Sequence, residues 1–236
     1  MLPEITAMIE LQRRWDAVLH GRAEIASARA VIAAEEKSAV SASQAHTARE
    51  KELSAAKAEL KSKEIDLLET EALLTKLEAK SYEALSKREL KAVETETEAA
   101  KQKKGSLEES IIALMDSIAS QETALASSAG ELSSKVASMK EKSATMKERI
   151  ARFESIIAEN EALFKTGLET LTPKTKSRFG KMVTSSDGKG IVQVEGEHCG
   201  GCRFNIPFDI RREASQGREL ISCPHCGKYI YAPDGQ

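Results

Sequence analysis

The long proline-free interval of this sequence constrains its fold more than any other feature. No proline occurs between Pro3 and Pro173, and glycine occurs there only at Gly21, Gly105, Gly130 and Gly167. Alanine, glutamate, lysine, serine and leucine fill the interval, and most of these residues favour helix. The interval is therefore expected to be helical over nearly all of its length.

Apolar residues recur every seven positions in two parts of this interval. The first ladder has one polar member and consists of Leu11, Val18, Ile25, Ile32, Ala39, His46, Leu53, Leu60, Leu67 and Leu74. The second ladder has no polar member and consists of Ile111, Ile118, Leu125, Leu132, Met139, Met146 and Phe153. Sustained seven-residue repeats are typical of coiled coils. The two ladders predict two helical arms that pack together along these seams.

Two ladders that pair within one chain need a turn between them. A turn near residues 77–82 gives arms of nearly equal length, which can pair throughout. The rival position is 104–106, because Ser106 and Glu109 have the spacing of a capping box, but it leaves unequal arms. One continuous helix that dimerises in parallel also satisfies the periodicity, so a homo-oligomer is compatible with it. We expect an antiparallel hairpin over residues 1–166 with its turn near 77–82.

The composition changes after Phe164. The next residues include Pro173, turn formers and several lysines, and residues 191–195 (IVQVE) alternate as a short strand does. We place a domain boundary near Gly167, so that residues 167–236 form a linker and a small second domain. The expected fold class is mainly α, a long helical hairpin with a small C-terminal β module.

All four cysteines lie in this second domain, in two Cys-x-x-Cys pairs. Cys199 and Cys202 form the first pair, and Cys223 and Cys226 form the second, with twenty residues between the pairs. Two such turns that face each other supply the four tetrahedral thiolates that Zn²⁺ prefers. We predict one structural zinc, because so short a segment cannot fold on its apolar residues alone.

Other readings of the cysteines fit less well. A single iron could also bind four thiolates. A redox pair would normally stand beside a βαβ unit, and a catalytic zinc would keep an open coordination position, which four cysteines close. His198 and His225 flank the pairs and are expected to be bystanders.

Charge and hydropathy limit the partners of the chain. There are 35 Lys and Arg against 37 Asp and Glu, a net charge of -2, which provides no overall attraction to nucleic acid or to an anionic membrane. No stretch approaches the roughly 18 apolar residues that cross a bilayer, and the N-terminus lacks a secretory pattern. We expect a cytoplasmic protein that does not insert into a membrane.

Basic residues in the second domain could act locally as contacts for phosphates or for a protein partner. They are Arg203, Arg211, Arg212, Arg218 and Lys228. Asp209, Glu213 and Glu219 are interspersed among them, so a mixed solvated surface is an equally good reading.

Three motifs carry a resemblance to a known family. The segment SYEAL at 81–85, the CGGC pair at 199–202 and the CPHCGKYIY segment at 223–231 follow a long helical region. This order resembles the bacterial coiled-coil proteins with a C-terminal four-Cys zinc ribbon, whose best-described relatives act in flagellar or type III secretion regulation. Known members bind the sigma-54-class polymerase factor or act as chaperones for it or for secretion-apparatus components. In one branch, basic residues of the ribbon bind a flagellin transcript.

The resemblance implies a non-enzymatic adaptor or chaperone that binds a sigma-54-class factor, or type III secretion or flagellar components. We expect it to bind them along the coiled coil, with the zinc ribbon as a second contact surface. The alternative is an RNA-binding protein that uses the basic residues of the ribbon. An enzyme is the least expected class, because no constellation of His, carboxylate or Ser side chains accompanies a closed metal site.

Overall fold

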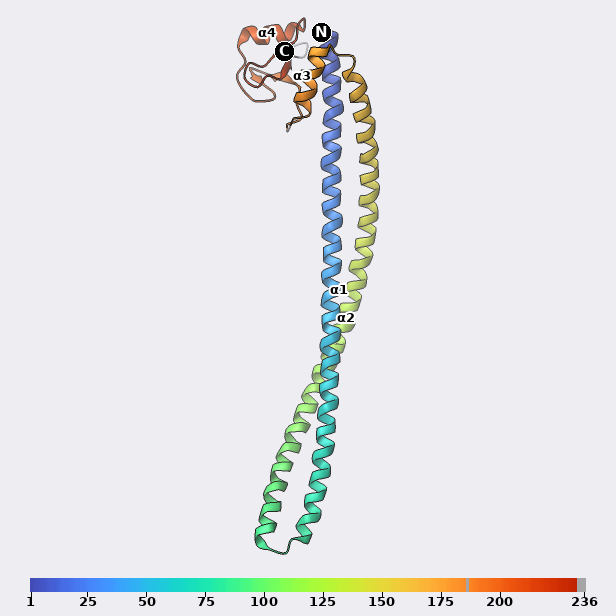
Figure 1. The fold of residues 1–236 in the computed structure, drawn as a ribbon, viewed down its shortest axis with the longest axis vertical. Coiled ribbons are helices and arrows are strands. Elements are labelled where there is room, and N and C mark those ends of the chain that lie inside the picture. The colour runs from blue at the N-terminus through green and yellow to red at the C-terminus, as the bar shows by residue number, and fades with distance from the viewer. Residues whose placement is uncertain (186, 233–236) are drawn as a thin grey trace. The chain divides into compact units, whose positions relative to one another are not determined.

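Two long helices account for most of the chain. The computed structural model describes residues 1–185 and 187–232, and in it α1 (Pro3–Glu83) and α2 (Lys87–Leu168) pack together as an antiparallel hairpin (Figure 1). Every member of both heptad ladders is buried or half-buried. The predicted fold class is confirmed. The helices pair because the seven-residue repeat keeps one apolar stripe of each helix facing its partner.

The turn of the hairpin lies at residues 84–86, beyond the predicted range of 77–82. Leu77 is 2% exposed, so α1 has to continue past it to bury that side chain. Ser86 then caps α2: the Glu89 backbone N–H donates to Ser86 Oγ at 3.2 Å, and the Ser86 N–H donates to Glu89 Oε2 at 3.1 Å. This reciprocal pair is a capping box, and it decides where the second helix begins.

The rival turn at 104–106 does not form. Helix α2 runs without a break through Gly105, and the Ser106 hydroxyl donates to the Lys103 carbonyl at 2.9 Å, as a serine inside a helix does. The Ser106 and Glu109 spacing is therefore not used as a cap. A continuous α1–α2 helix is also excluded for this fold, since the chain reverses after Glu83.

Contacts divide the chain into two compact units, residues 34–141 and residues 1–33 with 142–236. Within residues 34–141 the helices are joined by the apolar seam and by cross-helix polar pairs. Lys57 lies 2.6 Å from Glu122, and His46 Nδ1 lies 2.7 Å from Ser128 Oγ. The histidine of the first ladder is thus satisfied by a hydroxyl on the opposite helix.

The other unit contains the C-terminal module as well as both free ends of the hairpin. Helix α3 (Pro173–Val183) follows α2, and then come β1 (Ile191–Glu195), β2 (His198–Cys199), α4 (Phe208–Gln216), β3 (Ile221–Ser222) and β4 (Tyr229–Tyr231). The strands form one sheet in the order β2-β1-β4-β3, in which β1 and β4 are parallel and the outer pairs are antiparallel.

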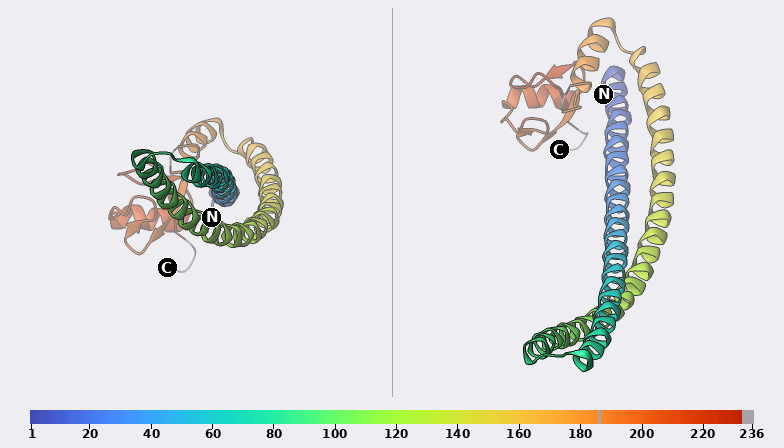
Figure 2. Two further views of the ribbon diagram at one scale, coloured as in Figure 1. Left: turned by 90° about the horizontal axis from the view of Figure 1, so that it is seen from below. Right: turned by 60° about the horizontal axis from the view of Figure 1, so that its bottom comes forward.

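One apolar core joins the module to the helices of its unit. Its buried members come from α1, α2, the α2–α3 connection, α3 and the sheet: Ile5, Met8, Leu11, Phe164, Leu171, Phe179, Val183, Ile191 and Tyr229. Both views of Figure 2 show α3 and the strands beside the N-terminal end of α1. Helix α2 ends at Leu168, next to the boundary expected near Gly167, but the module shares its core with the first turns of α1.

In the described part of the chain, no helix combines the length and the apolar character needed to cross a membrane.

Candidate metal centre

The two Cys-x-x-Cys turns are held at the same end of the small sheet. The first begins in β2, which pairs with β1 so that Cys199 lies opposite Val194. The second lies between β3 and β4, where Ser222 pairs with Tyr229. Since β1 and β4 are neighbours in the sheet, both turns project toward one another.

Both turns have the same backbone pattern. The N–H of Arg203 donates to the Cys199 carbonyl at 2.8 Å, and the N–H of Gly227 donates to the Cys223 carbonyl at 2.9 Å. The residue after the second cysteine is left-handed in each turn, with φ of 61° at Arg203 and 74° at Gly227. Glycine adopts this conformation freely, whereas Arg203 does so at a cost of about 1 kcal/mol.

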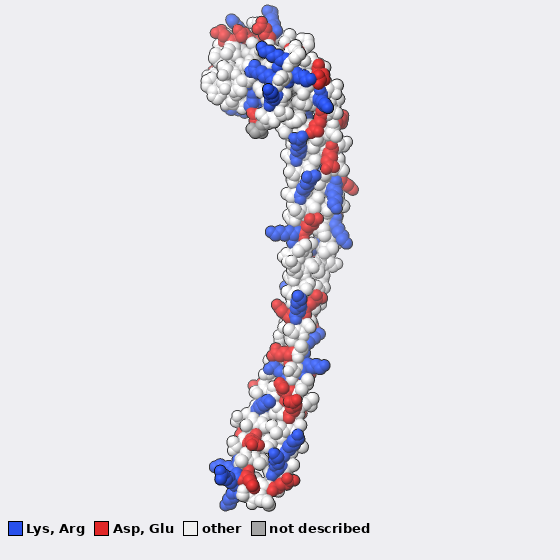
Figure 3. Space-filling model, in the orientation of Figure 1, with Lys and Arg blue, Asp and Glu red and all other residues white. Residues whose placement is uncertain are grey.

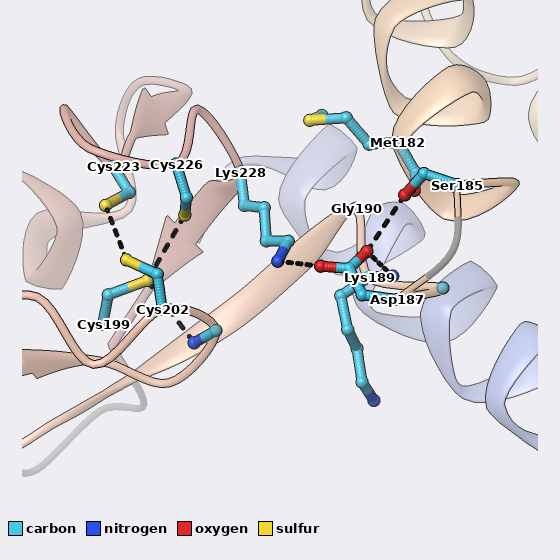
Figure 4. Close-up of polar contacts among 12 residues, drawn as sticks. Met182, Ser185, Asp187, Lys189, Gly190, Cys199, Cys202, Cys223, Cys226 and Lys228 are labelled. Atoms are coloured by element: carbon cyan, nitrogen blue, oxygen red, sulfur yellow. Dashed lines mark hydrogen bonds and ion pairs between the residues drawn. The ribbon is translucent and has the colours of Figure 1, made fainter.

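The four Sγ atoms form one cluster. The Sγ atoms of Cys199 and Cys226 lie 3.8 Å apart, as do those of Cys202 and Cys223, and all four lie within 4.8 Å of one another (Figure 4). Four sulfurs around Zn²⁺ at about 2.3 Å in a tetrahedron are separated by about 3.8 Å. The spacing of the thiols therefore fits one four-coordinate zinc.

The surroundings of Cys199 and Cys226 oppose the ionisation of these two thiols, whereas those of Cys223 favour it. Burial raises the pKa of Cys199 and raises the pKa of Cys226 to about 12. Burial acts in the same direction at Cys223, but hydrogen bonds from the backbone N–H groups of Cys226 and His225 outweigh it, and the pKa of Cys223 lies below its ordinary value. Metal binding to this site is thus coupled to the release of protons.

Neither flanking histidine belongs to this cluster, among the residues that the structure describes. His198 is exposed in β2, and the ring of His225 stacks on the ring of Phe204, with centroids 4.6 Å apart and planes inclined by 7°. This stack joins the two Cys-x-x-Cys turns on the outside of the site.

Residues 198–230 match the model of the C4-type zinc ribbon domain. The match covers both cysteine pairs, β2, β3 and the start of β4. Together with the spacing of the sulfurs, it assigns the site to one structural Zn²⁺. None of the curated proteins matches this chain.

Solved structures resemble the chain over almost its entire length. CT398 from Chlamydia trachomatis has a TM-score of 0.85 at 20% identity and covers 98% of each chain. HP0958 from Helicobacter pylori has a TM-score of 0.64 at 20% identity, with 99% of each chain covered. A protein from Mycobacterium smegmatis has a TM-score of 0.55 at 15% identity, covering 95% of this chain and 98% of its own. The fold of hairpin and zinc ribbon is therefore shared.

A series of hydrogen bonds and ion pairs links the second Cys-x-x-Cys turn of the zinc ribbon to α1. Lys228, two residues after Cys226, donates to the carboxylate of Asp187 (Figure 4). Asp187 also accepts from the Ser185 hydroxyl at 3.0 Å, and its pKa lies below its ordinary value, chiefly because of the Lys228 hydrogen bond. Lys189 then reaches Asp16 of α1 at 2.9 Å.

Most of the predicted basic contacts of the zinc ribbon are paired with carboxylates. Arg203 pairs with Glu195, Arg211 with Glu197, Arg212 with Asp209 and Lys228 with Asp187. Arg218 is exposed in the turn after α4. The ion pairs reduce the positive charge that these side chains offer to a phosphate, and Lys228 has a structural role as the link to Asp187.

A shallow hollow of about 640 Å³ lies on the zinc ribbon between α4 and the end of β1. Its walls include Val194, Glu197, Phe208, Arg211, Arg212 and Ser215. Phe208 is 67% exposed, and Arg211 lies over its ring at 5.8 Å. Both arginines were predicted as contacts from the sequence, but the hollow was not, because the two elements that form it are brought together only by the fold.

Proposed function

We propose that this protein is a non-enzymatic adaptor whose zinc ribbon binds a protein partner through the hollow beside Phe208. The exposure of Phe208 is the observation that carries the proposal. A phenylalanine that is two-thirds exposed contributes little to the ribbon core but can bury a large apolar area against a partner.

The charges around the hollow also favour a protein partner. Arg211 and Arg212 are each paired with a carboxylate, so the hollow presents an apolar wall with a polar rim of both signs. Protein interfaces commonly combine an aromatic anchor and arginine with such a rim. A surface for nucleic acid would instead present an uncompensated cluster of cations.

The family resemblance provides the first partners to test. A sigma-54-class polymerase factor is one, and components of the flagellar or type III secretion apparatus are the others. In this proposal the zinc is structural. It holds the two Cys-x-x-Cys turns in place beside β1 and α4, and it takes no part in chemistry.

The test is a direct binding measurement with each purified candidate partner and the full-length, zinc-loaded protein. Phe208→Ala should weaken binding by at least tenfold, because it removes the aromatic anchor. Phe204→Ala is the matched control, since Phe204 is exposed on the same ribbon but outside the hollow. Equal affinities for wild type and Phe208→Ala would refute this site.

RNA binding is the competing function and has its own signature. If the ribbon binds RNA through phosphates, affinity should fall steeply with salt, and the slope should decrease when Arg211 and Arg212 are replaced by Ala. Such a salt dependence, together with capture of partners that is lost after nuclease treatment, would favour RNA over the adaptor.

A further inference from the structure

The end of the hairpin carries two apolar side chains that the fold does not bury, one in the last turn of α1 and one in the connecting turn. Leu85 is 99% exposed and Tyr82 is 90% exposed, the two highest values for large apolar residues in the described part of the chain. Glu83 and Ala84 lie between them, at the point where the chain reverses. An exposed leucine in such a turn is unusual, because turns normally carry polar residues or glycine.

Local folding does not explain Leu85. Ser86 is the N-cap of α2, so Leu85 and Leu90 occupy the two positions of a hydrophobic staple, in which the residue before the cap packs on the fourth helical residue. A closed staple would cover Leu85, but its side chain is almost fully exposed. The capping box forms without a closed staple, and Leu85 is left available to a partner.

Positive charge surrounds this apolar pair. The tip, defined as residues 80–91, contains four exposed cations, Lys80, Lys87, Arg88 and Lys91, and two carboxylates, Glu83 and Glu89. Figure 3 shows Lys and Arg side chains gathered where α2 begins. The chain as a whole has a net charge of -2, so this excess of cations is local.

One of the two carboxylates is turned toward the backbone. Glu89 Oε2 accepts hydrogen bonds from the N–H groups of Leu85 at 3.3 Å and Ser86 at 3.1 Å. The N-terminus of α2 adds a partial positive charge, and the C-terminus of α1 beside it adds a negative one, so the excess charge of the tip comes from its Lys and Arg side chains.

We propose that the tip docks on the surface of an anionic phospholipid membrane. Leu85 would enter the boundary between headgroups and acyl chains, Tyr82 would lie at headgroup level, and the four cations would contact lipid phosphates. A flat membrane accepts a protruding turn without a complementary pocket. This contact uses no spanning helix and is independent of the function proposed for the zinc ribbon.

Flotation of the full-length, zinc-loaded protein with vesicles tests the proposal. Vesicles of equal parts phosphatidylglycerol and phosphatidylcholine should carry the protein, and pure phosphatidylcholine vesicles should bind it at least tenfold more weakly. Raised salt should weaken the binding, because screening reduces the attraction between cations and lipid.

Two tip variants separate the apolar and the charged contributions. Tyr82→Asp with Leu85→Asp, and Lys87→Glu with Arg88→Glu, should each reduce vesicle binding by at least tenfold. Leu68→Asp is the matched control, since Leu68 is also exposed on α1 but lies outside the tip, and it should bind as wild type does. Helical content by circular dichroism should be unchanged in all three, because the altered side chains are exposed.

Absence of flotation with anionic vesicles would overturn the proposal, as would equal losses in the Leu68 control and the tip variants. If the tip variants instead lose binding to a purified protein partner, and the wild-type protein does not bind vesicles, the tip is a protein-docking surface and the membrane proposal is wrong. Failure of the membrane test leaves the Phe208 hollow unaffected, because the two surfaces are probed by different variants.

Discussion

The side chain of Gln12 on α1 holds the backbone of Gly190 at the start of β1. Gln12 Oε1 accepts a hydrogen bond from the Gly190 N–H at 2.8 Å, and Gln12 Nε2 donates to the Gly188 carbonyl at 2.8 Å. Gln12 is 6% exposed, so these groups satisfy one another away from water. One amide thus joins the first helix of the chain to the sheet that carries the metal site.

Replacing Gln12 should loosen this junction. Gln12→Leu leaves the Gly190 N–H and the Gly188 carbonyl buried without partners, and should lower the free energy of unfolding by about 1–3 kcal/mol. Gln102→Leu, on an exposed face of α2, is the control and should change stability by less than about 0.5 kcal/mol. Urea denaturation measures both, and equal effects would contradict the role of Gln12.

The two candidate capping boxes can be compared directly. Ser86→Ala removes the hydroxyl that accepts from the Glu89 N–H, and should cost about 1 kcal/mol in the first turn of α2. Ser106→Ala should be close to neutral, because Ser106 lies inside a continuous helix. Hydrogen exchange of the amides that follow each serine reports the local effect. If Ser106→Ala speeds the exchange of the following amides more than Ser86→Ala does, the assignment of the turn to residues 84–86 is wrong.

Metal content should depend on the cysteines and not on the histidines. Cys199→Ser should abolish stoichiometric zinc and expose the ribbon core, since one sulfur of the four is lost. His225→Ala should keep one zinc per chain, because His225 stacks on Phe204 outside the cluster. Elemental analysis after gel filtration measures both. Chelation of wild type should unfold the ribbon while most of the helical signal persists.

Glu4 gives the stability a defined dependence on pH. Burial alone would raise the pKa of Glu4, but hydrogen bonds from the Thr172 N–H at 3.0 Å and hydroxyl at 2.8 Å outweigh it, and the pKa lies below the ordinary 4.5. A carboxylate with a lowered folded-state pKa stabilises the fold fully above its unfolded-state pKa, and this stabilisation disappears as pH falls through the folded-state value.

The comparison of wild type with Glu4→Gln isolates this effect. Wild type should melt at a higher temperature than Glu4→Gln at neutral pH, and the difference should shrink below pH 4.5. Thr172→Val should raise the pKa of Glu4 in a carboxyl NMR titration, because it removes the hydroxyl donor. A melting difference that stays constant down to pH 3, about the lower limit of carboxylate titration, would argue against this assignment.

Much of the fold was predictable because its signals are local and repeated. The heptad ladders from Leu11 to Leu74 and from Ile111 to Phe153 specify which stripe of each helix is buried. The turn was harder to predict, because a heptad repeat does not indicate the residue at which its helix ends. The capping box at Ser86 and Glu89 carries that information, but the same spacing at Ser106 and Glu109 is not used as a cap.

The sequence by itself determined the two heptad seams, the four-sulfur donor set and the basic residues of the module, since each depends on residue types at short spacings. Only the tertiary structure decided which contacts individual side chains make. It paired Lys228 with Asp187, left Phe208 exposed beside a hollow, and brought Gln12 to Gly190, 178 residues away. Contacts at such separations leave no periodic trace in a single sequence, because they arise when finished elements pack together.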